Sequence, residues 1–110
     1  MGFASEKREL VRLVARYVAG LSIDRRFVEE NTPPGAEGAI TNILEDVKSQ
    51  VLEIKQGLMI CRLCGEGPFT RTGLYLHLLR RHGNELVHLV MERVDERIRA
   101  ARKIGRLVAE

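Results

Sequence analysis

Two cysteines and two histidines in the middle of the chain are spaced in a way that suits a metal ion. They are Cys61, Cys64, His77 and His82, and in shorthand the segment reads C-x2-C-x12-H-x4-H. Zinc takes four thiolate or imidazole ligands in a tetrahedron. Cys-x-x-Cys supplies two thiolates from one tight turn, and two histidines near the end of a helix supply two imidazoles. The four residues therefore predict one structural Zn2+ site.

Other uses of these side chains fit the sequence less well. A disulfide between Cys61 and Cys64 would close a tiny loop and connect nothing distant. The surroundings show no βαβ pattern for a redox Cys-x-x-Cys, and a catalytic zinc would have only three protein ligands. Coincidence, with two reduced cysteines and two surface histidines, is the remaining alternative. The sequence shows no nucleophile–base pairing, phosphate-loop glycine pattern or carboxylate pair, so we expect neither an enzyme nor a small-molecule substrate.

Residues 59–83 resemble the C2H2 zinc-finger family in every interval between the ligands. Leu74 stands three residues before His77, where that family places its core leucine. Phe69 comes one residue later than the family's core aromatic, and Gly83-Asn84-Glu85 replaces the usual linker between fingers. The resemblance implies a single ββα finger, similar in plan to small single-finger proteins of archaea and archaeal viruses.

The spacing of apolar residues predicts helices on both sides of the finger. Apolar residues recur at intervals of three and four, and the Pro/Gly-rich segment 31–38 reads as a loop. The predicted helices are 5–20, a short turn at 23–30, 39–56 and 85–108. We therefore expect a mainly α protein, a helical and coiled-coil-like scaffold with one embedded ββα C2H2 finger. Its predicted segments are 1–57, 58–83 and 84–110.

The spacing of the two histidines determines where the finger helix can end. Five residues separate His77 from His82, which places them about 140° apart around a regular helix. The helix must therefore open or end before His82. Gly83 is the residue that we expect to allow this, in a left-handed position just after the helix.

The last predicted helix is long for so small a chain. At 1.5 Å per residue, residues 85–108 span about 35 Å, so this helix would protrude unless another helix lies along it. The partner is either the helix at 39–56 or the same helix of a second copy. We favour the second arrangement and expect a homodimer.

Positive charge is concentrated in the second half of the chain. Residues 1–57 carry eight cations and nine carboxylates, whereas residues 58–110 carry ten and six. This asymmetry favours an anionic partner, and we expect duplex DNA. A solvated face is the alternative for the basic stripe on the last helix. The candidate phosphate-binding residues lie on the finger and on this stripe: Arg62, Arg71, Arg80, Arg81, Arg99, Arg102, Lys103 and Arg106.

The finger is poorly equipped to read bases. Counting His77 as helix position 7, the base-reading positions −1, 3 and 6 hold Thr70, Gly73 and Leu76. Side chains that discriminate bases are mostly Arg, Lys, Asn, Gln or acids. We therefore expect DNA binding mainly through phosphates, as in a small transcriptional regulator or architectural protein. The alternative is a protein-interaction module whose apolar Leu74, Leu78 and Leu79 face a protein partner.

The N-terminal residues and the hydropathy of the chain show neither a signal-peptide pattern nor a membrane-spanning segment. The chain turns charged within its first residues, unlike a signal peptide, and no apolar run approaches the roughly 18 residues that span a bilayer. We expect a cytoplasmic protein that does not enter membranes, associated with the nucleoid or nucleus if it binds DNA.

Overall fold

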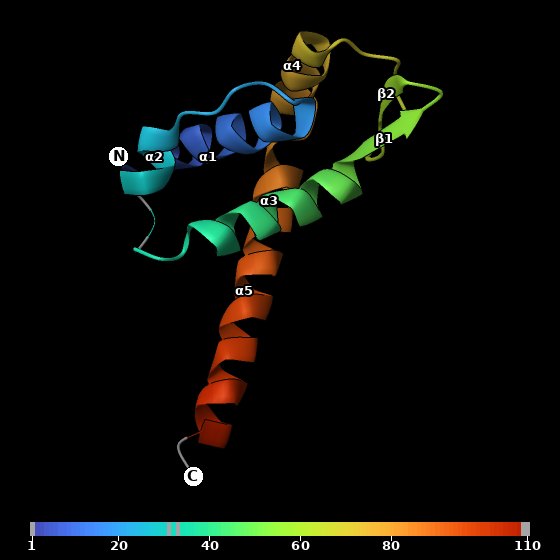
Figure 1. Cartoon of the computed structure of the whole chain (residues 1–110). Coiled ribbons are helices and arrows are strands. Elements are labelled where there is room, and N and C mark those ends of the chain that lie inside the picture. The colour runs from blue at the N-terminus through green and yellow to red at the C-terminus, as the bar shows by residue number, and fades with distance from the viewer. Residues whose placement is uncertain (1, 31, 33, 109–110) are drawn as a thin grey trace.

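Helices dominate the computed structural model, which describes residues 2–30, 32 and 34–108. A single β-hairpin lies between the third and fourth helices, so the expected mainly α fold with one ββα element is confirmed. The elements in chain order are α1 (Gly2–Ala19), α2 (Arg25–Glu30), α3 (Glu37–Val51), β1 (Leu52–Lys55), β2 (Leu58–Cys61), α4 (Arg71–Arg81) and α5 (Gly83–Val108) (Figure 1). None of the described helices has the length and apolar character needed to cross a membrane.

The expected helix over 39–56 is wrong in its last five residues. Helix α3 ends at Val51, and Leu52 already has extended backbone angles, φ −106° and ψ 129°. The chain then forms β1 and pairs with β2 in antiparallel register, Leu52 opposite Cys61 and Lys55 opposite Leu58. The hairpin replaces the last helical turn because residues 52–55 alternate apolar and polar side chains, pair with β2, and are followed by two residues with the positive φ values of a tight turn.

A two-residue turn closes this hairpin. Gln56 and Gly57 have φ values of 53° and 79°, the pair of positive angles that a type I′ hairpin turn requires. Gly57 therefore serves the turn and does not end a helix, as its position after 39–56 had suggested. Ile54, which had continued the helical seam, lies on the hairpin with 60% of its surface exposed.

One hydrophobic core joins the helices and the hairpin. Its fully buried members come from α1, α3, α4 and α5, together with the metal ligand Cys61. Full burial of a Leu or Val side chain contributes about 1.5–3 kcal/mol, so these residues account for much of the stability. The largest are Leu74, Leu78, Leu86, Val14, Val18, Val47 and Val51. The three segments 1–57, 58–83 and 84–110 thus share one core, and the finger is built into the scaffold.

The predicted long helix over 85–108 is confirmed as α5. The two halves of this helix have different surroundings. Leu86 and Val90 in the first half are buried against the other helices. Every described side chain from Asp95 to Lys103 is exposed. Figure 1 shows α5 crossing α3 and then running on beyond the rest of the molecule, which measures 53 × 34 × 21 Å along its principal axes.

Candidate metal centre

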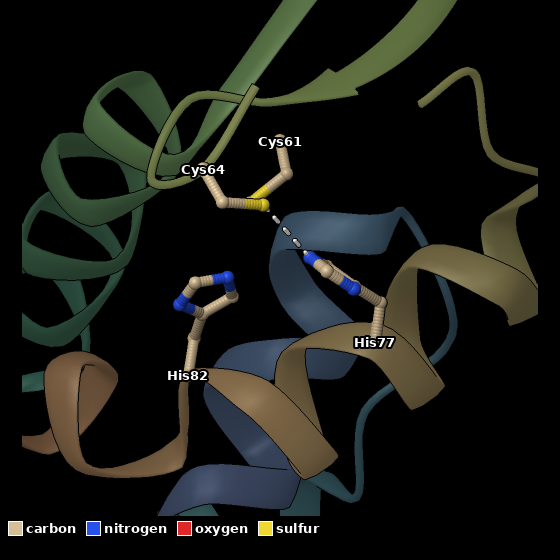
Figure 2. A group of neighbouring side chains, drawn as sticks. All are labelled: Cys61, Cys64, His77 and His82. Atoms are coloured by element: carbon tan, nitrogen blue, oxygen red, sulfur yellow. Dashed lines mark hydrogen bonds between the residues drawn. The ribbon is translucent and has the colours of Figure 1, made fainter. Parts of the chain in front are cut away.

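The four predicted ligands converge on one point. Cys61 ends β2, Cys64 follows in the next turn, His77 lies on α4, and His82 is the residue that ends α4. Figure 2 shows the two sulfur atoms and the two imidazole rings facing a common centre. Their four donor atoms lie within 4.8 Å of one another. A tetrahedral zinc site with bonds of about 2.0–2.3 Å has edges of roughly 3.3–3.8 Å, so a small contraction completes the geometry.

Backbone hydrogen bonds shape the turn that carries the cysteines. The Gly65 N–H donates to the Cys61 carbonyl at 2.7 Å, and the Cys61 N–H donates to the Glu66 carbonyl at 2.9 Å. Gly65 has a φ of 80°, a value that favours glycine. The chain then reverses, and the Phe69 N–H donates to the Met59 carbonyl at 2.9 Å. The finger's own hairpin therefore lies between β2 and Phe69, and β1 is an additional strand beside it.

Gly67 is the tightest point of this reversal. Its φ is 147°, and a Cβ built there would lie 2.8 Å from Ile60 Cδ1 and 2.9 Å from the Met59 carbonyl oxygen. No side chain fits without moving the strand. Glycine at this position keeps the second half of the finger hairpin against β2.

Helix α4 ends before His82, as the spacing of the two histidines requires. The residue at which the helix breaks is His82 and not the expected Gly83. His82 has φ −128° and ψ 19°, and its N–H still donates to the Leu78 carbonyl. Gly83 does not take a left-handed conformation and instead begins α5. The break falls on His82 itself because its carbonyl also accepts the first bond of α5, from the Leu86 N–H at 2.9 Å. A direct helix-to-helix junction therefore replaces the expected glycine cap.

A carboxylate lies behind each imidazole, and the one behind His82 is within hydrogen-bond distance. His82 Nδ1 lies 2.8 Å from Glu85 Oε1, and His77 Nδ1 lies 3.6 Å from Glu66 Oε2. Each Nε2 is left to face the centre, and His77 Nε2 lies 3.3 Å from Cys64 Sγ. Carboxylates behind histidine ligands fix the ring and raise its basicity. Neither Glu66 nor Glu85 was predicted from the sequence, although Glu85 follows His82 by three residues, about one helical turn.

One buried atom in the centre has no partner. Within the described residues, His82 Nε2 is buried and forms no hydrogen bond. An unsatisfied buried polar atom costs about 1–3 kcal/mol, so a folded protein rarely retains one without a use. A cation at the centre would satisfy it, and the set of two thiolates and two imidazoles is typical of zinc. These residues fit a metal ion with four protein ligands.

Burial changes the proton affinity of two ligands. It raises the pKa of the Cys61 thiol, backbone hydrogen bonds from Leu63 and Cys64 offset part of this rise, and the Cys64 side chain adds to it. Burial and the neighbouring His82 lower the pKa of His77. A neutral imidazole is the form that binds a metal. The lowered pKa of His77 therefore favours its metal-binding form. Cys61 needs a cation beside it to favour its thiolate.

An aromatic side chain that precedes α4 and apolar side chains on α4 support the centre. The Phe69 ring stacks on His77 with centroids 4.6 Å apart, and Leu74 is fully buried. Leu74 and Leu78 had been expected to face a protein partner in the alternative interpretation. Both are buried in the chain's own core, so that part of the interpretation is wrong, and Leu79 is partly buried against the same core.

The predicted nucleic-acid-binding residues fall into two groups. Arg62, Arg71, Arg80 and Arg81 are exposed around the finger. Arg99, Arg102 and Lys103 are exposed on the distal part of α5, whereas the side chain of Arg106 lies outside the described residues. Arg99 is 16 residues from the start of α5, or about 24 Å along the helix axis. The structure therefore does not bring the two groups together.

Thr70 has a structural use at the start of α4. Its hydroxyl oxygen accepts a hydrogen bond from the Gly73 N–H at 3.0 Å and caps the helix. The first base-reading position is thus already engaged.

The chain was compared with known protein families, curated proteins and solved structures. No protein-family model, curated protein or solved structure matches this chain.

Proposed function

We propose that this chain is a zinc-dependent protein that binds duplex DNA mainly through phosphates, as a small transcriptional regulator or architectural protein. The observation that carries the proposal is the free positive charge around the finger helix. Arg71, Arg80 and Arg81 are exposed, and within the described part of the chain none of them forms an ion pair. Such cations gain most from phosphates that they can approach directly.

The outer face of α4 agrees with weak base reading. Thr70 is engaged in the helix cap, Gly73 has no side chain, and Leu76 offers only an apolar contact. Phosphate contacts position a protein on DNA without selecting a sequence. We therefore expect similar affinity for unrelated duplexes of equal length.

A salt titration tests the proposal. The wild-type protein and the triple variant R71A/R80A/R81A are titrated with a duplex between about 50 and 200 mM salt. If each arginine meets one phosphate, the slope of log Kobs against log salt becomes shallower by about 2.7. The matched variant R25A/R26A/K55A removes three exposed cations elsewhere and should keep the wild-type slope. Absence of wild-type binding at about 50 mM salt contradicts the proposal.

We also propose that α5 joins two copies of the chain. Met91 and Ile98 are 54% and 45% exposed on one stripe of this helix. Residues 92–96 carry three carboxylates and one arginine, whereas residues 97–103 carry four cations and no carboxylate. Antiparallel pairing would place the acidic turns of one copy opposite the basic turns of the other, whereas parallel pairing would oppose like charges.

The oligomeric state tests this pairing. Sedimentation or light scattering at about 100 µM should give a dimer, and I98E should give a monomer because it places a charge in the apolar stripe. The control I54E changes an even more exposed apolar residue on the hairpin and should leave the dimer intact. A monomeric wild type, or dissociation by I54E as well, contradicts the pairing.

A further inference from the structure

Helix α1 brings a row of cations beside the finger helix, which the sequence alone had placed in a separate segment. Arg8, Arg12 and Arg16 are four residues apart and lie on one side of α1. Ala15 and Ala19, both fully buried, bring the backbone of α1 close to its neighbours. The Arg16 guanidinium lies 5.6 Å from the centre of the Tyr75 ring on α4. The row therefore runs along the finger helix.

A groove lies at the other end of this contact, between α1 and the junction of α4 and α5. Its volume is about 420 Å³, with Lys7, Arg8 and Arg12 on its rim and Val11 and Leu79 among its apolar lining. The remaining lining residues, Gly83 and Asn84, are uncharged, so no carboxylate lines the groove. An apolar floor with a cationic rim suits a sugar-phosphate strand, whose sugars are apolar on one side and whose phosphates are anionic.

The neighbouring cleft shows that this charge pattern is particular to the groove. The cleft between α1 and α2 presents Arg12, Arg16 and Arg26, but Glu9, Asp24 and Glu30 line it as well. Its charges balance, and a polyanion gains little there. Arg12 lines both hollows, but of the two only the groove beside α4 has described lining residues without a carboxylate.

The groove cations are also free to bind. Lys7, Arg8 and Arg12 are exposed, and among the residues described here none of the three makes an ion pair. On α5, by contrast, Arg99 is already paired with Asp95 at 2.8 Å. A phosphate that approaches α1 does not have to displace an internal carboxylate.

From these contacts we infer that Lys7, Arg8 and Arg12 of α1 hold a nucleic-acid phosphate backbone beside α4, so that the binding surface is composite. The inference rests on the proposed DNA binding and adds a second element to it. A lone finger covers about 3 base pairs. Contacts from α1 would extend that footprint along the backbone and compensate for the poor base-reading positions on α4.

The variant R8A/R12A tests the inference in the full-length, zinc-loaded protein. Removing two phosphate contacts should make the salt slope shallower by about 1.8 and weaken duplex binding roughly 60-fold at 0.1 M salt. The control R25A/K55A removes two exposed cations from α2 and the hairpin and should bind as the wild type does. Zinc content and circular dichroism should be unchanged in both variants, because all four side chains are exposed.

Three other outcomes overturn the inference. If R8A/R12A binds duplex with wild-type affinity and slope, the groove is not used, although the proposed function stands. If the wild type binds no duplex at about 50 mM salt, the proposed function and the inference fail together. If the wild type prefers poly-glutamate to duplex, and R8A/R12A loses that binding, the groove serves an acidic protein segment.

Discussion

The finger helix α4 and the distal part of α5, residues 95–103, are both amphipathic but have different surroundings. Both have apolar residues on one side and arginines on the other. In α4 the apolar side is buried, with Leu74 and Leu78 fully inside the core. In α5 the residues from Asp95 to Lys103 are exposed on every side. Amphipathic spacing thus indicates that a helix has an apolar face, but it does not indicate what covers that face.

The difference implies two sources of helix stability. Helix α4 has 11 residues, and isolated helices shorter than about 12–15 residues are marginal in water. It depends on the core and on the metal ligands at its end. The distal part of α5 continues a long helix and, in a single copy of the chain, has no packing to lose.

Metal removal should separate the two regions most strongly. Apparent binding free energies of structural zinc in finger peptides are about 10–16 kcal/mol, more than most small domains have as total stability. Chelation should unfold the segment 59–83, including α4. Hydrogen exchange with mass spectrometry should show loss of protection in α4 and little change in residues 95–103, and added zinc should reverse the loss. A metal-free protein that keeps full protection in α4 contradicts a structural metal.

Truncation of one apolar residue in each helix is the next test. Leu78→Ala should lower the free energy of unfolding by about 2–5 kcal/mol because it leaves a cavity in the core. Ile98→Ala should change it by less than about 0.5 kcal/mol at low protein concentration, where the side chain is exposed. Urea denaturation at a few micromolar measures both. Equal effects would mean that the distal part of α5 is packed within one copy of the chain.

The same contrast explains how far the sequence could predict the fold. The four ligands were predictable because metal spacing depends on local turns and one helix. The hairpin was missed in part because Ile54 and Leu58 continued an apolar spacing that also suits a helix. The alternating Leu52-Glu53-Ile54-Lys55 and the Gln56-Gly57 turn were the contrary signal.

Other features could not be predicted because they depend on contacts between distant segments. The burial of Leu78 depends on the packing of α1 against α4, whereas Leu74 already stood at the core-leucine position of the finger motif. The row of arginines on α1 gained its place beside the finger in the same way. The end of α4 at His82 depends on a hydrogen bond to the next helix, which the glycine rule does not include.

Removal of the carboxylate behind His82 should lower the metal affinity and leave the site intact. Glu85→Gln keeps the shape but removes the charge that orients the imidazole, and we expect a 10–100-fold loss of metal affinity. Glu92→Gln is the matched control, because Glu92 lies 2.9 Å from His88 on the exposed part of α5 and should not affect the metal. Competition with a chromophoric chelator measures both affinities. A similar loss in the two variants would mean that overall charge, and not ring orientation, controls affinity.

The helix cap on α4 should give the smallest effect. Thr70→Ala removes the side-chain acceptor of the Gly73 N–H and should cost about 1 kcal/mol. Thr72→Ala, on the exposed surface of the same helix, removes a hydroxyl that forms no hydrogen bond to the described residues. Urea denaturation of the zinc-loaded protein measures both. The cap matters because α4 begins after a turn and has no preceding helix to extend, whereas the distal part of α5 starts inside a helix and needs none. If Thr70→Ala leaves stability unchanged but weakens DNA binding, Thr70 faces DNA, and the first base-reading position is free after all.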